Sequence, residues 1–226
     1  MIGIIIAMEE ELQELLPSIK NLEIITIKDL TFYKGTISNK DCIIGLSGVG
    51  KVNAARTTQI MLDLYNPIKI INIGVSGSCD PSLNIGDIII ATKLYQHDFD
   101  ISIFNHNPGY IPKVGDCIEL PFEELNLLKQ KLSSIYPNIY LGTCISGDKF
   151  ISDREEKLVL YKKFGSSCCD MEAASIAQIC YLSQVPFLII RSISDTLKPN
   201  IKEEYEKFLK ESSHILALIL EKYLQS

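Results

Sequence analysis

Residues 1–11 read Met-Ile-Gly-Ile-Ile-Ile-Ala-Met-Glu-Glu-Glu, and this stretch indicates the fold class. Residues 1–7 form an apolar run rich in isoleucine without polar alternation, which is typical of a strand covered on both faces. From Met8 to Leu16 apolar residues recur at helical spacing, and Pro17 ends this pattern. A buried strand followed directly by a helix predicts the first unit of an α/β sheet.

The same alternation continues along the chain of 226 residues. We expect further strands at 42–46, 69–73, 87–91, 139–144 and 187–193, and helices at 52–65 and 171–182. A closing helix is predicted where one face is shared by Tyr205, Phe208, Leu209, Ser212, Leu216 and Ile219. Because no repeat or linker interrupts the pattern, it predicts one α/β domain over residues 1–226, with a central mixed sheet flanked by helices.

The composition is that of a folded protein with a modest negative charge. Apolar residues make up 46% of the chain and charged residues 22%, which excludes a disordered or collagen-like chain. The net charge is −6 and no basic block is present, so nucleic-acid binding is not expected. Seven cysteines without C-x-x-C spacing favour buried free thiols over a metal site.

The sequence indicates neither a secretory signal nor a membrane helix. The apolar start has no charged region before it and continues directly into three glutamates, unlike a signal peptide. Other apolar stretches, such as 215–220, fall short of the roughly 20 residues that a membrane helix needs. We therefore expect a cytoplasmic protein without membrane contact.

One predicted connection is unusually long. Residues 94–117 include several aromatic residues, two histidines, Pro108, Gly109 and Pro112. A loop of this length inside a compact domain is usually functional or mobile. We expect this segment to form a lid or a contact between subunits.

Residues with useful chemistry follow several of the predicted strands. Ligands of α/β sheets bind beyond the carboxyl ends of the strands, so the residues just after each strand are candidates for a site. Four junctions carry acidic, basic or glycine-rich residues: 8–11, 74–78, 170–172 and 191–195. Each acidic residue could merely cap a helix or a turn, and their shared position at strand ends is what indicates a site.

Three glutamates lie at the start of the first predicted helix. Helix N-termini stabilise carboxylates by roughly 0.3–1 kcal/mol, so capping explains two of Glu9, Glu10 and Glu11. The third, turned inward beside Met8, could act as a general base for water, since burial makes a carboxylate more basic. These residues alone do not show which glutamate points inward.

Two glycine-containing segments match known motifs only in part. Residues 45–51 have the G-x-x-x-x-G-K spacing of a phosphate-binding loop, but Val52 offers no hydroxyl for magnesium. We therefore interpret this segment as a tight turn with Val49 facing a ligand. Residues 74–78 nearly form a nucleophile elbow, but Ser78 replaces the last glycine and no histidine lies nearby in the sequence.

Five segments occur in the order and spacing of one enzyme family: Ala7–Glu11, Ser47–Lys51, Ser146–Ile151, Asp170–Ala173 and Arg191–Asp195. On these motifs, over nearly its whole length, the chain resembles the 5′-methylthioadenosine/S-adenosylhomocysteine nucleosidases. The resemblance implies the nucleoside phosphorylase/hydrolase fold, a homodimer and a role in methionine salvage. It also implies hydrolysis of small adenine nucleosides to adenine and a thio-sugar without metal or cofactor.

The resemblance also implies roles for individual residues. Glu11 resembles the general base that activates water, Asp195 the acid that protonates adenine at N7, and Glu172 the residue that holds the ribose hydroxyls. Phe150 resembles the residue that stacks on the base, and the backbone of Ile151 the group that bonds its exposed edge, with Met171, Gly77 and Ser194 completing the pocket. Arg191 matches a further substrate-binding position. The family's apolar pocket for the 5′-thio group matches Met8, Val49 and Tyr205, and the residues lent by a neighbouring subunit match Ile101 and Phe104.

The expected chemistry agrees with the residue types. Cleavage of an N-glycosidic bond passes through an oxocarbenium-like sugar, which requires negative charge near the ribose and an acid at the leaving group. Asp195 can serve as that acid if burial raises its pKa above the usual value of about 3.9. No arginine precedes Arg56, and the three glutamates at 9–11 would repel phosphate, so hydrolysis is favoured over phosphorolysis.

Three positions depart from the family pattern. Val75 replaces a serine, for which Ser76 could substitute, Ser78 replaces a glycine, and His106 stands where an aromatic residue is expected. The preferred 5′ group therefore stays open, with 5′-deoxyadenosine and futalosine-type compounds among the candidates. The alternatives to a nucleosidase are a purine nucleoside phosphorylase and a non-catalytic nucleoside-binding relative of the same fold.

Overall fold

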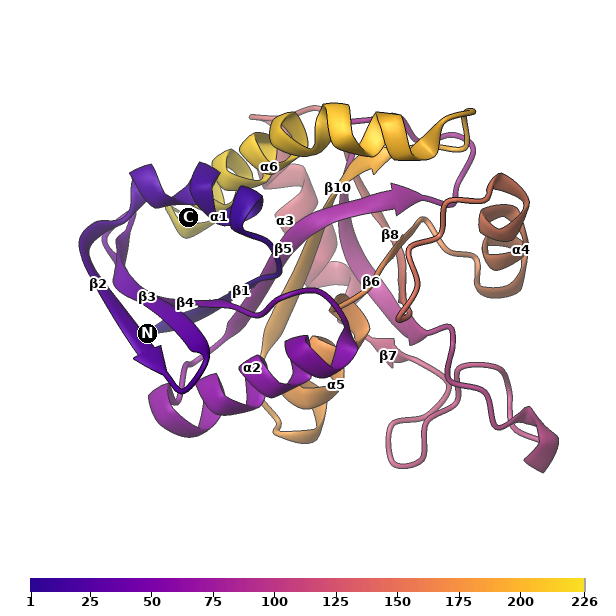
Figure 1. Ribbon diagram of the computed structural model, residues 1–226, viewed down its shortest axis with the longest axis horizontal. Coiled ribbons are helices and arrows are strands. Elements are labelled where there is room, and N and C mark those ends of the chain that lie inside the picture. The colour runs from indigo at the N-terminus through magenta and orange to yellow at the C-terminus, as the bar shows by residue number, and fades with distance from the viewer. Residues whose placement is uncertain (226) are drawn as a thin grey trace.

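One mixed β-sheet runs through the computed structural model, which describes residues 1–225 (Figure 1). Its strands are β1 (Ile2–Ile6), β2 (Lys20–Ile27), β3 (Leu30–Ile37), β4 (Lys40–Leu46), β5 (Ile70–Ser78), β6 (Ile88–Gln96), β7 (Ile118–Glu119), β8 (Ile139–Ser146), β9 (Cys168–Asp170) and β10 (Phe187–Asp195). The helices are α1 (Glu9–Leu15), α2 (Lys51–Tyr65), α3 (Phe122–Ser133), α4 (Arg154–Phe164), α5 (Ala173–Leu182) and α6 (Ile201–Gln225). The predicted α/β fold with a mixed sheet flanked by helices is confirmed.

The sheet curls until five of its strands close into a ring. The strand order is β10-β6-β8-β9-β5-β1-β4-β3-β2, and β10 also pairs with β5. Strands β4, β1, β5 and β10 are parallel to one another, so their carboxyl ends lie at the same edge. Near that edge β9 pairs antiparallel with the end of β5, bringing a fifth chain segment to the same place.

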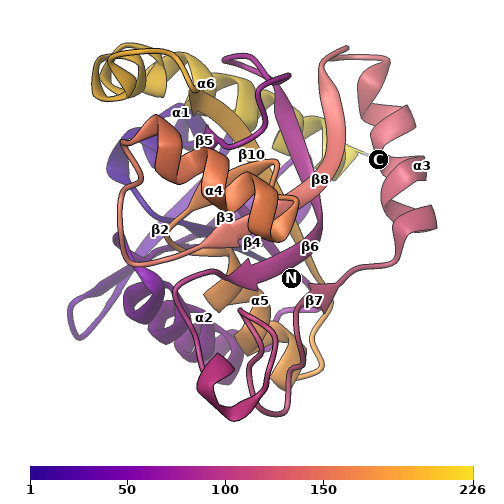
Figure 2. The same cartoon turned by 90° about the vertical axis from the view of Figure 1, so that its right-hand side faces the viewer.

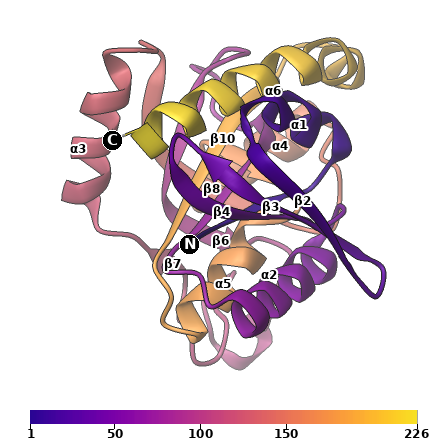
Figure 3. The same cartoon turned by 90° about the vertical axis from the view of Figure 1, so that its left-hand side faces the viewer.

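The central strands are buried on both faces, as the isoleucine-rich run predicted. Ile4, Ile5 and Ile6 of β1 are fully buried, and every residue of β5 is buried. Such strands carry apolar side chains on both faces because helices cover the sheet on each side. Here α2 and α5 cover one face while α6, with α1 packed against it, covers the other (Figures 1 and 3).

Several element boundaries differ from the prediction. The helix expected from residue 171 begins at Ala173, because Asp170 ends β9 and Glu172 takes the N-cap position of α5. The strand expected at 87–91 extends to Gln96, because residues 88–96 pair with β8 over nearly its whole length. The hairpin β2–β3 and the helices α3 and α4 were not predicted. Figure 2 shows α4 lying over the outside of the ring and α3 beside β8.

The long connection is shorter than expected and begins after β6. Residues 97–117 contain a single 3-10 turn at Ser102–Phe104 and project away from the sheet (Figure 1). Ile103 and Phe104 at this projection are exposed. Across residues 1–225, no helix combines the length and apolarity that a bilayer-spanning segment needs.

Candidate active site

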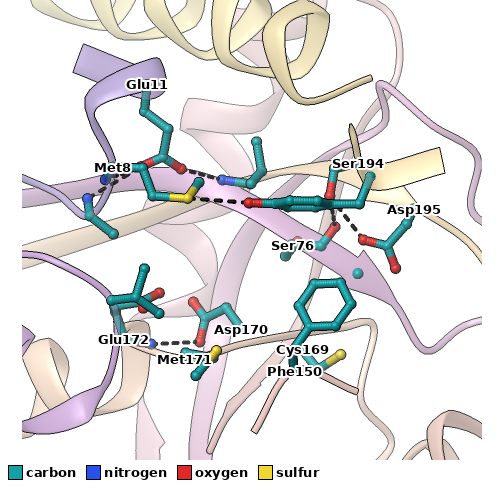
Figure 4. A pocket seen from close by; sticks show the side chains of 15 residues that line it. Met8, Glu11, Ser76, Phe150, Cys169, Asp170, Met171, Glu172, Ser194 and Asp195 are labelled. Atoms are coloured by element: carbon teal, nitrogen blue, oxygen red, sulfur yellow. Dashed lines mark hydrogen bonds between the residues drawn. The ribbon is translucent and has the colours of Figure 1, made fainter. Parts of the chain in front are cut away.

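A cavity opens at the edge where the parallel strands end, and all four predicted junctions contribute to it (Figure 4). Its lining residues are Ala7, Met8, Glu11, Val49, Val75, Ser76, Gly77, Phe150, Cys169, Asp170, Met171, Glu172, Ser194, Asp195 and Tyr205. The site is thus built from the ends of β5, β9 and β10 and from the segments that follow β1, β4, β8 and β9, together with α1 and α6.

Glu11 is the inward-facing glutamate of the three at the start of α1. Its side chain is 4% exposed, whereas Glu9 and Glu10 are exposed to solvent. Three backbone amides hold its carboxylate: Oε2 accepts from Ala7 N at 3.2 Å and from Met8 N at 3.1 Å, and Oε1 accepts from Val75 N at 2.9 Å. These bonds fix the carboxylate at the wall of the cavity.

The surroundings of Glu11 make it a stronger base than a glutamate in water. Burial raises its pKa, while the hydrogen bond from Val75 and the charge of Arg191 oppose that shift. A buried carboxylate with a raised pKa accepts a proton more readily near neutral pH. Glu11 therefore has both the position and the basicity to activate a water molecule.

A β-bulge directs Asp195 into the cavity. Along the β5–β10 pair, Ile193 lies opposite Ser76 and Asp195 opposite Gly77, so Ser194 is the extra residue. Ser194 Oγ donates to Asp195 Oδ1 at 3.0 Å and lies 3.2 Å from the carbonyl oxygen of Ser76. A Cβ at Gly77 would lie 2.7 Å from Asp195 Oδ2, so only glycine leaves room for the carboxyl group there.

Asp195 is enclosed, as the role of acid expected for it requires. It is 1% exposed, and burial raises its pKa, although Lys157 and the hydroxyl of Ser194 act in the opposite direction. Lys157 Nζ donates to Asp195 Oδ2 from within the protein. Sequence reasoning missed this lysine; its helical spacing with the buried residues Leu160 and Phe164 was the signal that placed it on the inner face of α4.

Glu172 lies at the N-terminus of α5 on the opposite wall from Asp195 (Figure 4). Its Oε1 accepts a hydrogen bond from Gly50 N at 2.8 Å. Gly50 has a φ of 102°, a conformation that favours glycine. Burial, with a further contribution from the neighbouring Asp170, raises the pKa of Glu172 to about 7.

Arg191 lies behind the wall of the cavity. It is 1% exposed and absent from the lining residues, so its expected place among the residues that contact a ligand is corrected here. Its Nε donates to Asp170 Oδ2 at 2.5 Å, and its Nη2 donates to Asn72 Oδ1 at 2.5 Å. A Cβ at Gly74 would lie 3.0 Å from both Arg191 Nη1 and Glu11 Oε1, so a side chain at this position would crowd both groups.

One end of the cavity is apolar and partly open. Met8, Val49 and Tyr205 line it, and Phe150, which is 44% exposed, packs its ring edge-on against Tyr205 with centroids 5.3 Å apart. The hydroxyl of Tyr205 donates to Met8 Sδ at 3.2 Å, which places one polar atom among apolar groups (Figure 4). This end can accept a hydrophobic or thioether substituent.

Some expected residues lie outside this cavity. Ile151 lines a small adjoining hollow behind Phe150, next to Gly77 and Asp195. Ile101 and Phe104 lie on the projecting loop and do not line the cavity of their own chain.

The structure also shows the surroundings of the positions that depart from the family pattern. Val75 contributes its backbone amide to Glu11, and Ser76 Oγ is buried with no hydrogen-bond partner among the described residues. His106 stacks on Tyr110 in the exposed loop, with ring centroids 4.0 Å apart. Within residues 1–225, no group of three or more His, Cys, Asp or Glu side chains is arranged to hold a metal ion.

The ring-closed mixed sheet with an acidic cavity at its strand ends defines a protein of the phosphorylase superfamily, whose family model matches residues 1–225. A 5′-methylthioadenosine/S-adenosylhomocysteine nucleosidase of Staphylococcus carnosus is 37% identical to the chain, with both proteins covered in full. The chain therefore belongs to the family of these nucleosidases.

Two solved structures from Helicobacter pylori are similar over almost the whole chain. One is the nucleosidase of that family, complexed with an aminopyrrolopyrimidine joined to a thio-substituted pyrrolidinol; it is 35% identical, with a TM-score of 0.91 and coverage of 99% of this chain and 96% of that one. The other is a futalosine hydrolase, 34% identical, with a TM-score of 0.91 and coverage of 98% and 95%.

Stability should depend on pH through Glu172. Because its pKa is about 7 in the folded protein against an ordinary value of 4.5, folding becomes less favourable as pH rises from 4.5 to 7. Glu172→Gln removes this effect, so the variant should gain up to about 3 kcal/mol relative to wild type across that range, at 1.4 kcal/mol per pKa unit. Urea unfolding at a series of pH values measures the difference. A flat difference between Glu172→Gln and wild type across this pH range would contradict the account.

Proposed function

We propose that the chain hydrolyses the N-glycosidic bond of 5′-methylthioadenosine and S-adenosylhomocysteine, releasing adenine and the corresponding 5-thio-ribose product. The observation that carries the proposal is the placement of two buried carboxyl groups with different surroundings, Glu11 and Asp195, on separate parts of one cavity wall. The nucleosidases among the relatives support the choice of substrates.

Glu11 is the general base in this proposal. Three backbone amides orient its carboxylate, so it can hold a water molecule and take a proton from it as the water attacks the anomeric carbon. Burial, which raises the pKa of Glu11, makes that proton transfer more favourable than it would be for an exposed glutamate.

Negative charge around the ribose stabilises the cationic sugar that forms as the bond breaks. Glu172 accepts hydrogen bonds from the ribose hydroxyls in the proposed pose, and Glu11 lies on the other side of the same space. Because these carboxyl groups are buried, their fixed charges act more strongly on a developing cation than exposed charges would.

Asp195 is the general acid for the leaving purine. Its O–H bond breaks as a proton moves to N7, while the electrons of the glycosidic bond pass to the base. Ser194 orients the carboxyl group through its hydroxyl. Phe150 stacks on the purine, and Met171, Gly77 and the backbone of Ile151 complete its surroundings in this pose.

Water rather than phosphate is the proposed nucleophile. Among the described lining residues, four are acidic and none is lysine, arginine or histidine. Arg191, the nearest buried arginine, is already paired with Asp170. A phosphate dianion would meet repulsion without a cationic clamp, so a purine nucleoside phosphorylase is the less favoured reading. Glu11 and Asp195 are both retained and buried, which also disfavours a non-catalytic relative.

The 5′ substituent occupies the apolar end of the cavity. Met8, Val49 and Tyr205 offer apolar surface for a methylthio group, and the opening beside Phe150 leaves room for the longer homocysteine chain. The similarity to a futalosine hydrolase extends the candidate substrates to nucleosides with other 5′ groups.

We further propose a cytoplasmic homodimer that serves methionine salvage. In this dimer the loop of residues 97–117 reaches the apolar end of the neighbouring cavity with Ile101 and Phe104. Phe104 is 71% exposed in the single chain, an arrangement that burial against a second subunit would relieve.

Activity should depend on Glu11 and Asp195. Incubation of the protein with 5′-methylthioadenosine in phosphate-free buffer should release adenine. Glu11→Gln and Asp195→Asn should each lower kcat by about 100-fold or more, since each removes a proton-transferring group. The matched control Glu10→Gln alters an exposed glutamate of the same helix turn and should leave kcat unchanged. Full activity of either site variant would overturn the assigned roles.

The dimer proposal is tested by mass and by kinetics together. Sedimentation equilibrium should give twice the mass of one chain. Phe104→Ser should raise KM for 5′-methylthioadenosine by about tenfold, the effect of losing one buried apolar contact, with a smaller change in kcat. A fully active monomer would contradict the proposal.

A further inference from the structure

A lysine with no part in the proposed chemistry lies directly behind the general acid. The side chain of Lys157, on α4, is 0% exposed, and its Nζ donates to Asp195 Oδ2. Burying an ammonium group is unfavourable unless a carboxylate compensates for the lost water. The ammonium group of Lys157 is therefore paired with the carboxyl group of Asp195.

The end of β5 is shaped around the pair. A Cβ at Gly77 would lie 2.7 Å from both Lys157 Nζ and Asp195 Oδ2, so any other residue would push the two groups aside. The other groups that act on the pair come from four neighbouring segments: the hydroxyl of Ser194, the more distant carboxylate of Glu204 on α6, and the thiols of Cys79 and Cys169. None of these four groups is a cation, so the positive charge next to Asp195 comes from Lys157.

A general acid works only if its conjugate base is stable in the site after the proton has been transferred. When the O–H bond of Asp195 breaks and the N7–H bond forms, a carboxylate remains in a buried site. Without a counter-ion this anion is strongly disfavoured, and the acid holds its proton too tightly to transfer it. An ammonium group within hydrogen-bond reach relieves that penalty.

We propose that Lys157 is a positioning residue for the general acid: its ammonium group holds Asp195 toward the purine and stabilises the carboxylate that proton transfer leaves behind. This inference rests on the proposed nucleosidase function. Lys157 keeps its own protons throughout; the one transferred proton passes from Asp195 to N7, and the electrons of the broken glycosidic bond go to the purine. The effect of Lys157 is therefore confined to substrates whose leaving group needs a proton.

The test compares two leaving groups on Lys157→Met. With 5′-methylthioadenosine, kcat at neutral pH should fall by about tenfold or more, because general acid catalysis contributes about 100-fold or more in total. With a 4-nitrophenyl 5-methylthio-riboside, whose phenolate leaves without protonation, kcat should stay within about twofold of wild type. The exposed Lys162 on the same helix gives a matched control, Lys162→Met, which should change neither rate.

The pH profile adds a second readout. Activity requires protonated Asp195, so the rate falls at alkaline pH as this group ionises. Removal of the Lys157 charge should move that alkaline limb upward by about one pH unit or more, the size of effect that an adjacent opposite charge has on a carboxyl pKa. The double variant Lys157→Met with Asp195→Asn should be at least as stable to urea as Lys157→Met alone, because no unpaired carboxylate remains.

Two outcomes would contradict the account, each at a different point. An equal loss on both substrates in variants that still unfold cooperatively, with an unmoved alkaline limb, would mean that Lys157 only supports the fold and would overturn the inference. If Lys157→Met does not fold, Lys157→Gln carries the same comparison. A wild-type protein that cleaves neither substrate would instead refute the proposed function itself, so the two failures are distinguishable.

Discussion

The site depends on an imbalance of buried charge. Four carboxyl groups face one cavity: Glu11, Asp170, Glu172 and Asp195. Within residues 1–225, the fully buried cationic side chains are Arg191, which bonds Asp170, and Lys157, which bonds Asp195. Glu11 and Glu172 receive hydrogen bonds only from backbone amides among the bonds described. The cavity is therefore short of positive charge beside the place where a sugar cation would form.

The fold holds the acidic residues together at the cavity although burying their charges is unfavourable. Parallel pairing brings the ends of β1, β5 and β10 to one edge, and the return of β9 to β5 adds Asp170 and Glu172. The bulge at Ser194 turns Asp195 inward. Because these constraints act through the backbone, central strands that are buried on both faces fix the positions from which the four acidic side chains reach the cavity.

Sequence reasoning predicted the strands richest in isoleucine and the four junctions that meet at the cavity, because continuous apolar runs and strand-end ligands follow general rules. The residue pattern did not choose among Glu9, Glu10 and Glu11, since helix phase and the amides of a distant strand decide that; only the family resemblance indicated Glu11. It missed Lys157, because a lysine on a charged helix ordinarily faces solvent. It placed Arg191 at the ligand, because strand position alone does not show that Asp170 and Asn72 hold the guanidinium behind the wall.

The most direct measurement of the central claim is the affinity of two nucleoside analogues of the same shape, one with a cationic pyrrolidine and one with a neutral cyclopentane in place of the ribose. If buried negative charge is complementary to a sugar cation, calorimetry should show the cationic analogue binding about 100-fold or more tightly. Replacement of Glu11 and Glu172 by glutamine should remove most of that preference. Equal affinity of the wild-type protein for both analogues would contradict the account.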